Sequence, residues 1–350
     1  MTQFERTLRE IRPVDPRWIE AAARRQLELT KPPGSLGRLE EIANRCAGIR
    51  ESFVLTAARP RIVLFAADHG VCAEGVSAYP QEVTAQMVLN FLRGGAAINA
   101  FARAGGIELK VVDIGVAAPL PASDELISRR VAPGTRNFCE QPAMTEAEMT
   151  AALETGIGLA CDSADAGCDL LGCGEMGIGN TTSASAIAAA LTGVPLEELV
   201  GRGAGADEAC LARKRSAIRR ALALHEEALA DPLAILRCVG GLEIAAMCGF
   251  CLGAAARRVP VVTDGFIATA AAALAVRIAP AAGGCLFASH RSAEPGHAHF
   301  LAMLGQEPLL SLGMRLGEGT GAALAMKLMQ AAIAAFTGMA TFASAGVSNR

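Results

Sequence analysis

The chain has 350 residues, a formal net charge of −3 and 4% aromatic residues. That length allows a large hydrophobic core, and we expect one large domain with a smaller appendage. The few aromatic residues, the slightly negative charge and the dispersed arginines and lysines argue against a nucleic-acid-binding surface.

The segments that bear on localisation are the N-terminus and two apolar windows. The N-terminal residues are charged and contain no apolar run of the kind found in secretory signals. The windows Val239–Ala256 and Phe266–Ala282 are rich in alanine and glycine and contain Glu243 and Arg277, which is typical of buried helices rather than membrane spans. We therefore expect a cytoplasmic protein with no membrane partner.

Cysteine and histidine patterns bear on metal binding. Eleven cysteines are scattered through apolar segments, as expected of reduced, buried thiols. Cys248 and Cys251 form a C-x-x-C pair in the middle of a helical run, without the second pair of ligands that a zinc site needs. His297 and His299 would point to opposite sides of a strand, or about 200° apart on a helix. A metal site is not favoured, and we expect no cofactor.

In chain order, a polar, helical N-terminal piece precedes an alternation of strands and helices. Its helices are predicted at 18–30 and 36–51. Buried strands are predicted at 62–67, 109–113, 168–173, 260–264 and 285–290, and a further strand at 314–318. Further helices are predicted at 82–104, 145–164, 182–191, 207–227, 242–257, 266–278 and 321–336. This alternation predicts an α/β fold with a mainly parallel sheet flanked by helices.

Polar groups follow the predicted strands in a consistent way: Asp68, Asp113, Glu175, Asp264, Ser289 with His290, and Glu318. Ligands of open parallel sheets bind beyond the C-terminal ends of the strands. A single acid there often caps the next helix, and Asp113 fits that role at least as well. Taken together, these polar residues at the strand ends form a row that predicts an acidic crevice. Such a crevice would suit polyols and a cationic or oxocarbenium-like centre.

The glycine-rich stretch Leu170–Ser185 predicts a strand, a loop and a helix N-terminus, which together suit an anion. Gly172-x-Gly174-x-x-Gly177 also satisfies the dinucleotide fingerprint, but no strand-end acid follows about 20 residues later. A P-loop would need a lysine where Asn180 stands. A monophosphate or phosphorylated sugar, with Glu175 on its hydroxyls, fits better. The positive charge could come from Lys214, Arg202 or Arg291, with Ser292 beside it.

Two other segments carry chemistry. Glu318 stands between Gly317 and Gly319, so a planar substrate could approach it closely and burial could raise its pKa toward that of a general base. The alternative is a solvated acid favoured by the dipole of the following helix. Tyr79, Gln86 and Met87 could line a flat heteroaromatic pocket, although the segment could equally be a routine entry into a helix.

These motifs resemble one family. KPPGSLGRLE, AADHGV, VSAYPQEVTAQM, GEMGIGNTT, VTDGF and RLGEGTGAALA span nearly the whole chain and are similar to the nicotinate-nucleotide–dimethylbenzimidazole phosphoribosyltransferases of cobalamin lower-ligand assembly. The resemblance implies transfer of the phosphoribosyl group of nicotinate mononucleotide to 5,6-dimethylbenzimidazole, giving α-ribazole 5′-phosphate and nicotinate with anomeric inversion. It also implies a Rossmann-like sheet (60–330), a small helical domain from both chain ends (1–59 with 331–350) and a homodimer.

The resemblance further implies the roles of individual residues. Glu318 matches the catalytic base, and Glu175 lies near the ribose and the reacting centre. The base-binding residues would be Ser77, Tyr79, Gln86, Met87 and Leu316. The phosphate- and ribose-binding residues would be Gly174, Gly177, Asn180, Lys214, Asp264 and Ser292. The rival interpretations are the same reaction with another purine, benzimidazole or phenol, a dinucleotide-dependent oxidoreductase, and a silent nucleotide sensor.

Overall fold

A computed structural model describes residues 1–203 and 205–348 of the chain. Its six strands form one sheet in the order β3-β2-β1-β4-β5-β6, and every neighbouring pair is parallel. This is the strand order of the Rossmann fold, so the predicted fold class is confirmed. The strands are β1 (Pro60–Ala67), β2 (Glu108–Gly115), β3 (Leu126–Ser128), β4 (Leu170–Met176), β5 (Val261–Thr263) and β6 (Leu286–Ala288).

Helices connect and cover the strands. They are α1 (Gln3–Glu10), α2 (Pro16–Gln26), α3 (Arg38–Arg50), α4 (Val83–Leu92), α5 (Ala97–Gly105), α6 (Glu146–Asp165), α7 (Asn180–Thr192), α8 (Leu196–Leu199), α9 (Glu208–Leu224), α10 (Pro232–Val239), α11 (Leu242–Ala256), α12 (Phe266–Ile278), α13 (Pro295–Leu304), α14 (Thr320–Gly338) and α15 (Phe342–Ala345). Short 3₁₀ turns lie at Gly70–Glu74, Glu226–Ala228 and Pro280–Cys285.

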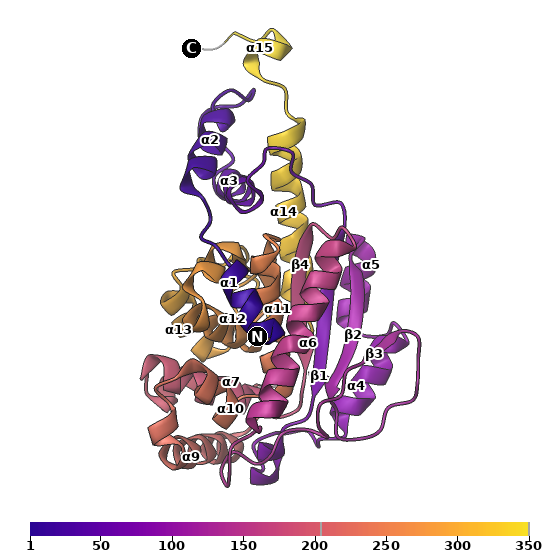
Figure 1. Cartoon of the computed structure of the whole chain (residues 1–350), viewed down its shortest axis with the longest axis vertical. Helices are drawn as coiled ribbons and strands as arrows, with labels where there is room; N and C mark the ends of the chain where they lie inside the picture. Colours follow the sequence, from indigo (N-terminus) through magenta and orange to yellow (C-terminus); the bar gives the residue numbers. More distant parts are fainter. Residues whose placement is uncertain (204, 349–350) are drawn as a thin grey trace.

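The sheet is sandwiched between two helical layers (Figure 1). Helix α11 packs on β1, β2 and β4 and is covered in turn by α6. Helix α4 contacts the same three strands, and α14 contacts β1, β4 and β5. Because both faces of the sheet are covered, its strands are apolar on both sides, and β1 is buried along nearly its whole length.

Several predicted elements differ from the structure. Residues 314–318 form an irregular segment instead of a strand, and the sixth strand is β3, which is too short to give a sequence signal. The helix predicted at 82–104 is two helices, α4 and α5, because Gly94 adopts a left-handed φ of 75° between them. Helices α1, α10, α13 and α15 were not predicted.

The glycine-rich stretch also folds differently from the prediction. Gly172 and Gly174 lie within β4, so the loop itself is only 177–179. A Cβ on Gly172 would lie 2.7 Å from Cε of Met326, and one on Gly174 would lie 2.5 Å from the backbone of Glu318. These two glycines therefore allow α14 and the segment before it to approach the sheet.

Helices α2 and α3 lie beside the C-terminal part of α14 at one end of the molecule, whereas the N-terminus itself lies near the middle (Figure 1). There α3 packs against α2 and the long helix α14, and Phe53 makes edge contacts with the rings of Trp18 and Phe336. Helix α1 lies elsewhere, on α6 and α11. The division into 60–330 and a helical domain from the chain ends stays a prediction. Helix α14 is long and apolar enough to cross a membrane, but half of its apolar window is buried inside the structure, as in a core helix.

Candidate active site

A cavity of about 690 Å³ lies beyond the C-terminal ends of the paired strands β1 and β4. This is the point at which the strand order reverses, where open α/β sheets bind ligands. The segment after β1 contributes Val76–Tyr79, Val83 and Met87, and the segment after β4 contributes Gly177–Thr181. The remaining walls come from distant segments: Arg202, Gly203, Ala206, Lys214, 265–267, His290, Ser292, Glu294 and 315–318.

Glu318 enters this cavity from an unusual backbone conformation. Its φ is 63°, between Gly317 and Gly319 at 91° and 89°. A non-glycine residue in the left-handed region carries a local strain of order 1–3 kcal/mol and is typical of functional sites. The carboxyl accepts a hydrogen bond from the N–H of Ile98, at the start of α5, at 3.3 Å. Burial raises the pKa of Glu318 despite that bond, as a general base near neutral pH requires.

Glu175, the last but one residue of β4, is 6% exposed. Burial raises its pKa to about 8, helped by the charges of Glu243 and Asp264, while a hydrogen bond from the Asn180 side chain opposes the rise. A Cβ on Gly317 would lie 2.4 Å from Oε1 of Glu175. Any side chain at position 317 would therefore clash with Glu175. The glycine allows the segment that carries Glu318 to lie against the end of β4.

Asp264, predicted to bind phosphate or ribose, has another function in the structure. It does not line the cavity. Its carboxylate accepts the N–H groups of Gly319, Gly321 and Ala322 at 3.0, 2.7 and 3.2 Å, so it caps the start of α14. Burial raises its pKa to about 6, and the three backbone bonds oppose that rise. Asp264 therefore holds in place the backbone that directly follows Glu318.

Gly174 and the strand-end acids Asp68 and Asp113 also lie outside the cavity. Asp68 accepts the N–H of Ala117 at 2.7 Å, and Asp113 accepts that of Val116 at 2.9 Å. Asp113 thus holds a loop and not the helix N-terminus considered above. The predicted row of acids is therefore only partly a cavity wall, with Glu175 and Glu318 as its members there.

One side of the cavity, the closed half, consists of Gly177, Thr181, Lys214, Ser292 and Glu294. Lys214 donates to Thr181 Oγ1 at 2.8 Å and is 3% exposed, and burial lowers its pKa while Glu294 opposes the shift. Glu294 accepts the N–H of Gly203 at 3.0 Å. One buried cation, a hydroxyl and the start of α7 give this half the groups that a monophosphate needs.

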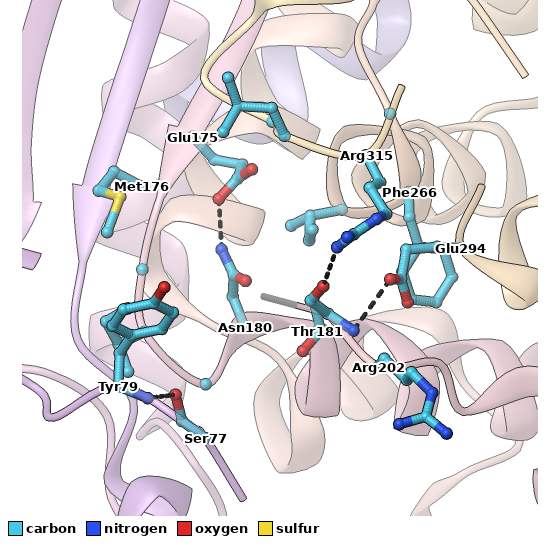
Figure 2. Close-up of a pocket in the computed structure, with 18 of the residues that line it drawn as sticks. Ser77, Tyr79, Glu175, Met176, Asn180, Thr181, Arg202, Phe266, Glu294 and Arg315 are labelled. Carbon is cyan, nitrogen blue, oxygen red and sulfur yellow. Dashed lines mark hydrogen bonds between the residues drawn. The ribbon is translucent and has the colours of Figure 1, made fainter. Parts of the chain in front are cut away.

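The other side, the open half, consists of Ser77, Tyr79, Met87 and Leu316. Figure 2 shows Ser77 and Tyr79 across the cavity from Glu294 and Arg315. Tyr79 is 50% exposed and Leu316 58% exposed. Gln86, which we predicted beside Met87, is exposed on α4 and does not line the cavity. An apolar, open slot of this kind suits a flat ring system.

The structure brings most of the predicted residues into one site, together with some that the sequence did not single out. Besides Glu175, Glu318, Asn180 and the two halves, Arg202 and His290 line the cavity, whereas His69 and Arg291 do not. Four contributors gave no sequence signal of their own: Thr181, Glu294, Arg315 and Phe266. Thr181, Arg315 and Phe266 stand inside quoted motifs, but only the fold shows that Arg315 donates to the carbonyl of Gly203 at 2.8 Å.

Within 1–203 and 205–348, no three His, Cys, Asp or Glu side chains are grouped to hold a metal ion. All eleven cysteines are free thiols, and burial raises the pKa of Cys248 beyond the physiological range. The polar groups that line the cavity include carboxylates, one buried lysine, the arginines Arg202 and Arg315, the imidazole of His290 and several hydroxyls.

A Rossmann-type sheet with a monophosphate-like subsite beside two buried carboxylates is consistent with an enzyme of phosphorylated sugars. The family model described as Phosphoribosyltransferase matches residues 11–347. The chain belongs to the nicotinate-nucleotide–dimethylbenzimidazole phosphoribosyltransferase family. The member from Chloroflexus aggregans is 56% identical over 352 residues, covering 100% of this chain and 99% of its own length. That from Desulforudis audaxviator is 50% identical, covering 99% of each.

Solved structures agree with this assignment. The crystal structure of the enzyme from Thermus thermophilus has a TM-score of 0.90 at 50% identity, and the match covers 96% of this chain and 100% of that one. The family named from the sequence motifs is thereby confirmed.

Proposed function

We propose that this chain transfers the phosphoribosyl group of nicotinate mononucleotide to 5,6-dimethylbenzimidazole, giving α-ribazole 5′-phosphate and nicotinate. The observation that carries the proposal is that Glu318, a buried acid with a raised pKa, lines the same cavity as an open apolar slot and a closed phosphate-like subsite. Relatives at 50–56% identity carry the name of this activity.

In this proposal the closed half holds the donor. Lys214 and the hydroxyl of Ser292 face the 5′-phosphate, and the N–H groups at the start of α7 lie beside them. The leaving nicotinate is a pyridinium in the substrate. When its bond to C1′ breaks, the bonding pair neutralises the ring nitrogen, so departure needs no general acid.

The open half holds the acceptor between Tyr79, Met87 and Leu316. One imidazole nitrogen of the benzimidazole attacks C1′ from the face opposite nicotinate, which inverts the anomeric centre. Glu318 takes the proton from the other nitrogen, so the product ring is neutral. The raised pKa of Glu318 makes its carboxylate a stronger base than an exposed glutamate.

Glu175 provides the charge that the transition state needs. In the free protein its pKa of about 8 leaves it mostly protonated at neutral pH. The pyridinium of the donor and the oxocarbenium-like C1′ are positive, so their arrival favours the ionised form. A carboxylate facing the developing charge lowers the barrier, and the Asn180 amide fixes its orientation.

The test is to incubate the protein with nicotinate mononucleotide and a panel of benzimidazoles, purines and phenols, and to identify the products by mass spectrometry. We expect α-ribazole 5′-phosphate with dimethylbenzimidazole. Because Glu318 must be ionised, kcat/KM should rise with pH through an apparent pKa above the usual glutamate value of about 4.3. Absence of nicotinate release with every acceptor would overturn the proposal.

Other features of the protein are proposed on the same basis. We propose a homodimer located in the cytoplasm, without nucleic-acid or membrane partners, and a helical domain formed by 1–59 with 331–350. Size-exclusion chromatography with light scattering measures the assembly, and limited proteolysis maps the domain boundary.

A further inference from the structure

A chain of three buried hydrogen bonds joins two walls of the cavity behind the closed half. The N–H of Ser292 donates to Nδ1 of His297 at 2.9 Å. The ring's Nε2 lies 2.9 Å from Oγ1 of Thr269, and that hydroxyl donates to the carbonyl of Gly265 at 2.8 Å. Ser292 and Gly265 line the cavity, while His297 and Thr269 are fully buried behind it.

Donor and acceptor accounting fixes every proton in this chain. A backbone N–H can only donate, so Nδ1 of His297 must present its lone pair to Ser292. A carbonyl can only accept, so the Thr269 hydroxyl gives its proton to Gly265 and must accept from the ring. The consistent assignment is a neutral imidazole with its proton on Nε2.

Protonating this ring would place an N–H against the N–H of Ser292. The neighbourhood also disfavours the charged form, because burial lowers the pKa of His297 to about 3, helped by His290 and Arg291. The ring centroids of His290 and His297 are 6.2 Å apart. His297 therefore stays in one tautomer at neutral pH.

The arrangement determines what Ser292 offers to a ligand. Its N–H is used by His297, and its hydroxyl oxygen accepts the N–H of Glu294 at 3.3 Å. The hydroxyl proton is left free to donate into the cavity. A hydroxyl donor near Lys214 has the polarity that a phosphate oxygen requires.

We propose that His297 is a positioning residue for the 5′-phosphate of the donor, acting as a neutral Nε2–H imidazole that fixes Ser292 relative to the start of α12. The inference rests on the proposed function only in naming the phosphate as that of the donor nucleotide. It predicts a selective effect on the closed half, because the chain of bonds does not involve the open half.

Two matched pairs of variants test it. His297→Asn keeps an acceptor at the Nδ1 position, whereas His297→Gln places its amide nearer the Nε2 position. Thr269→Val removes the hydroxyl at similar volume, and Thr269→Ser restores it. The ligands are ribose 5-phosphate, which contains no nicotinate, and dimethylbenzimidazole, with dissociation constants measured by calorimetry.

We expect His297→Gln to weaken ribose 5-phosphate binding about tenfold and His297→Asn by less, in keeping with the loss of one hydrogen bond. Thr269→Val should weaken it a few-fold and Thr269→Ser should not. Dimethylbenzimidazole binding should stay unchanged throughout. Nitrogen NMR of the imidazole should show the Nε2–H tautomer across about pH 6 to 8.

Equal losses in the Asn and Gln variants, parallel losses for both ligands, or a ring protonated on Nδ1 would overturn the inference. The outcome is separable from the proposed function. Ribose 5-phosphate binding and the tautomer report on His297 even if no acceptor releases nicotinate, and turnover could persist in a protein whose His297 has no positioning role.

Discussion

The two halves of the cavity are built differently. In the closed half, Lys214, Ser292 and Glu294 are buried. Lys214 donates to the half-buried Thr181, Glu294 accepts the N–H of Gly203, and the backbone N–H of Ser292 donates to His297. In the open half, Tyr79 and Leu316 are at least half exposed, and the hydrogen bond there is a local turn from Tyr79 N–H to Ser77. The closed half is preorganised for one ligand, whereas the open half can accept several ring systems.

Glu318 lines the same cavity as both halves and is the proposed base, so its loss should have the largest effect. Glu318→Gln keeps the size of the side chain but cannot take the acceptor's proton, and we expect kcat to fall by roughly 10²–10⁴. Steady-state kinetics with both substrates measure this. Glu82→Gln, at an exposed acid that does not line the cavity, is the control. A Gln variant with full kcat would show that the base lies elsewhere.

Glu175, which lines the cavity, couples the site to the stability of the fold. Its pKa is about 8 when folded against an unperturbed value of 4.5, so the folded protein binds the extra proton and loses stability as pH rises between these values. Glu175→Gln removes this dependence. We expect the free energy of unfolding of the variant to exceed that of the wild type by about 2–4 kcal/mol above pH 8, with no difference near pH 4.5.

Urea titrations at several pH values measure the difference. Activity should fall in the same variant, because a neutral amide cannot stabilise a positive transition state. If the stability gap does not widen with pH, the carboxyl is already ionised in the folded protein.

Lys214 tests whether the closed half binds phosphate. Lys214→Met keeps the length of the side chain but removes its charge, and we expect KM for nicotinate mononucleotide to rise about 10- to 100-fold, as for loss of a charge-assisted bond. KM for the acceptor should change little. Lys110→Met is a matched control, because Lys110 pairs with Glu108 at the start of β2. A rise in the acceptor KM alone would reverse the assignment of the halves.

Tyr79 should give the smallest effect. Its ring is half exposed, so Tyr79→Phe should change the acceptor KM by less than about threefold, and Tyr79→Ala by a few-fold more. The order of preference among benzimidazoles, purines and phenols should shift in the Ala variant. Competition assays with paired acceptors measure that order. A collapse of kcat in Tyr79→Phe would mean that the hydroxyl takes part in the chemistry.

The fold was predictable where hydrophobic runs were long. β1 and β4 are buried, continuous and followed by polar residues, so both were found from the pattern. β3 has only three residues, which are not fully buried, and its register with β2 depends on the folded sheet. Residues 314–318 look like a strand because Met314 and Leu316 alternate with polar residues, but left-handed glycines prevent pairing.

The parts of the site that come from one short, continuous segment of the chain could be predicted from the sequence. The glycines around Glu318 and the run ending at Asn180 are recognisable from their spacing alone. Glu294 could not be found in this way, because its partner Gly203 is 91 residues away. Asp264 was placed at the correct strand end, yet its carboxylate faces three N–H groups of α14 and not the cavity. The sequence pattern can show that a residue lies at the end of a strand. The direction in which its side chain points is known only from the packed structure.

The left-handed backbone at Glu318 has an evolutionary consequence. Glycine adopts a φ of 63° without strain, and it would also remove a carboxyl that burial forces toward protonation. Glu318→Gly, which would remove the proposed base, would therefore also relieve this strain, at the cost of the hydrogen bond from the Ile98 N–H. Since Glu318 is the proposed base, we expect a chain that is no longer selected for the proposed reaction to lose this glutamate readily.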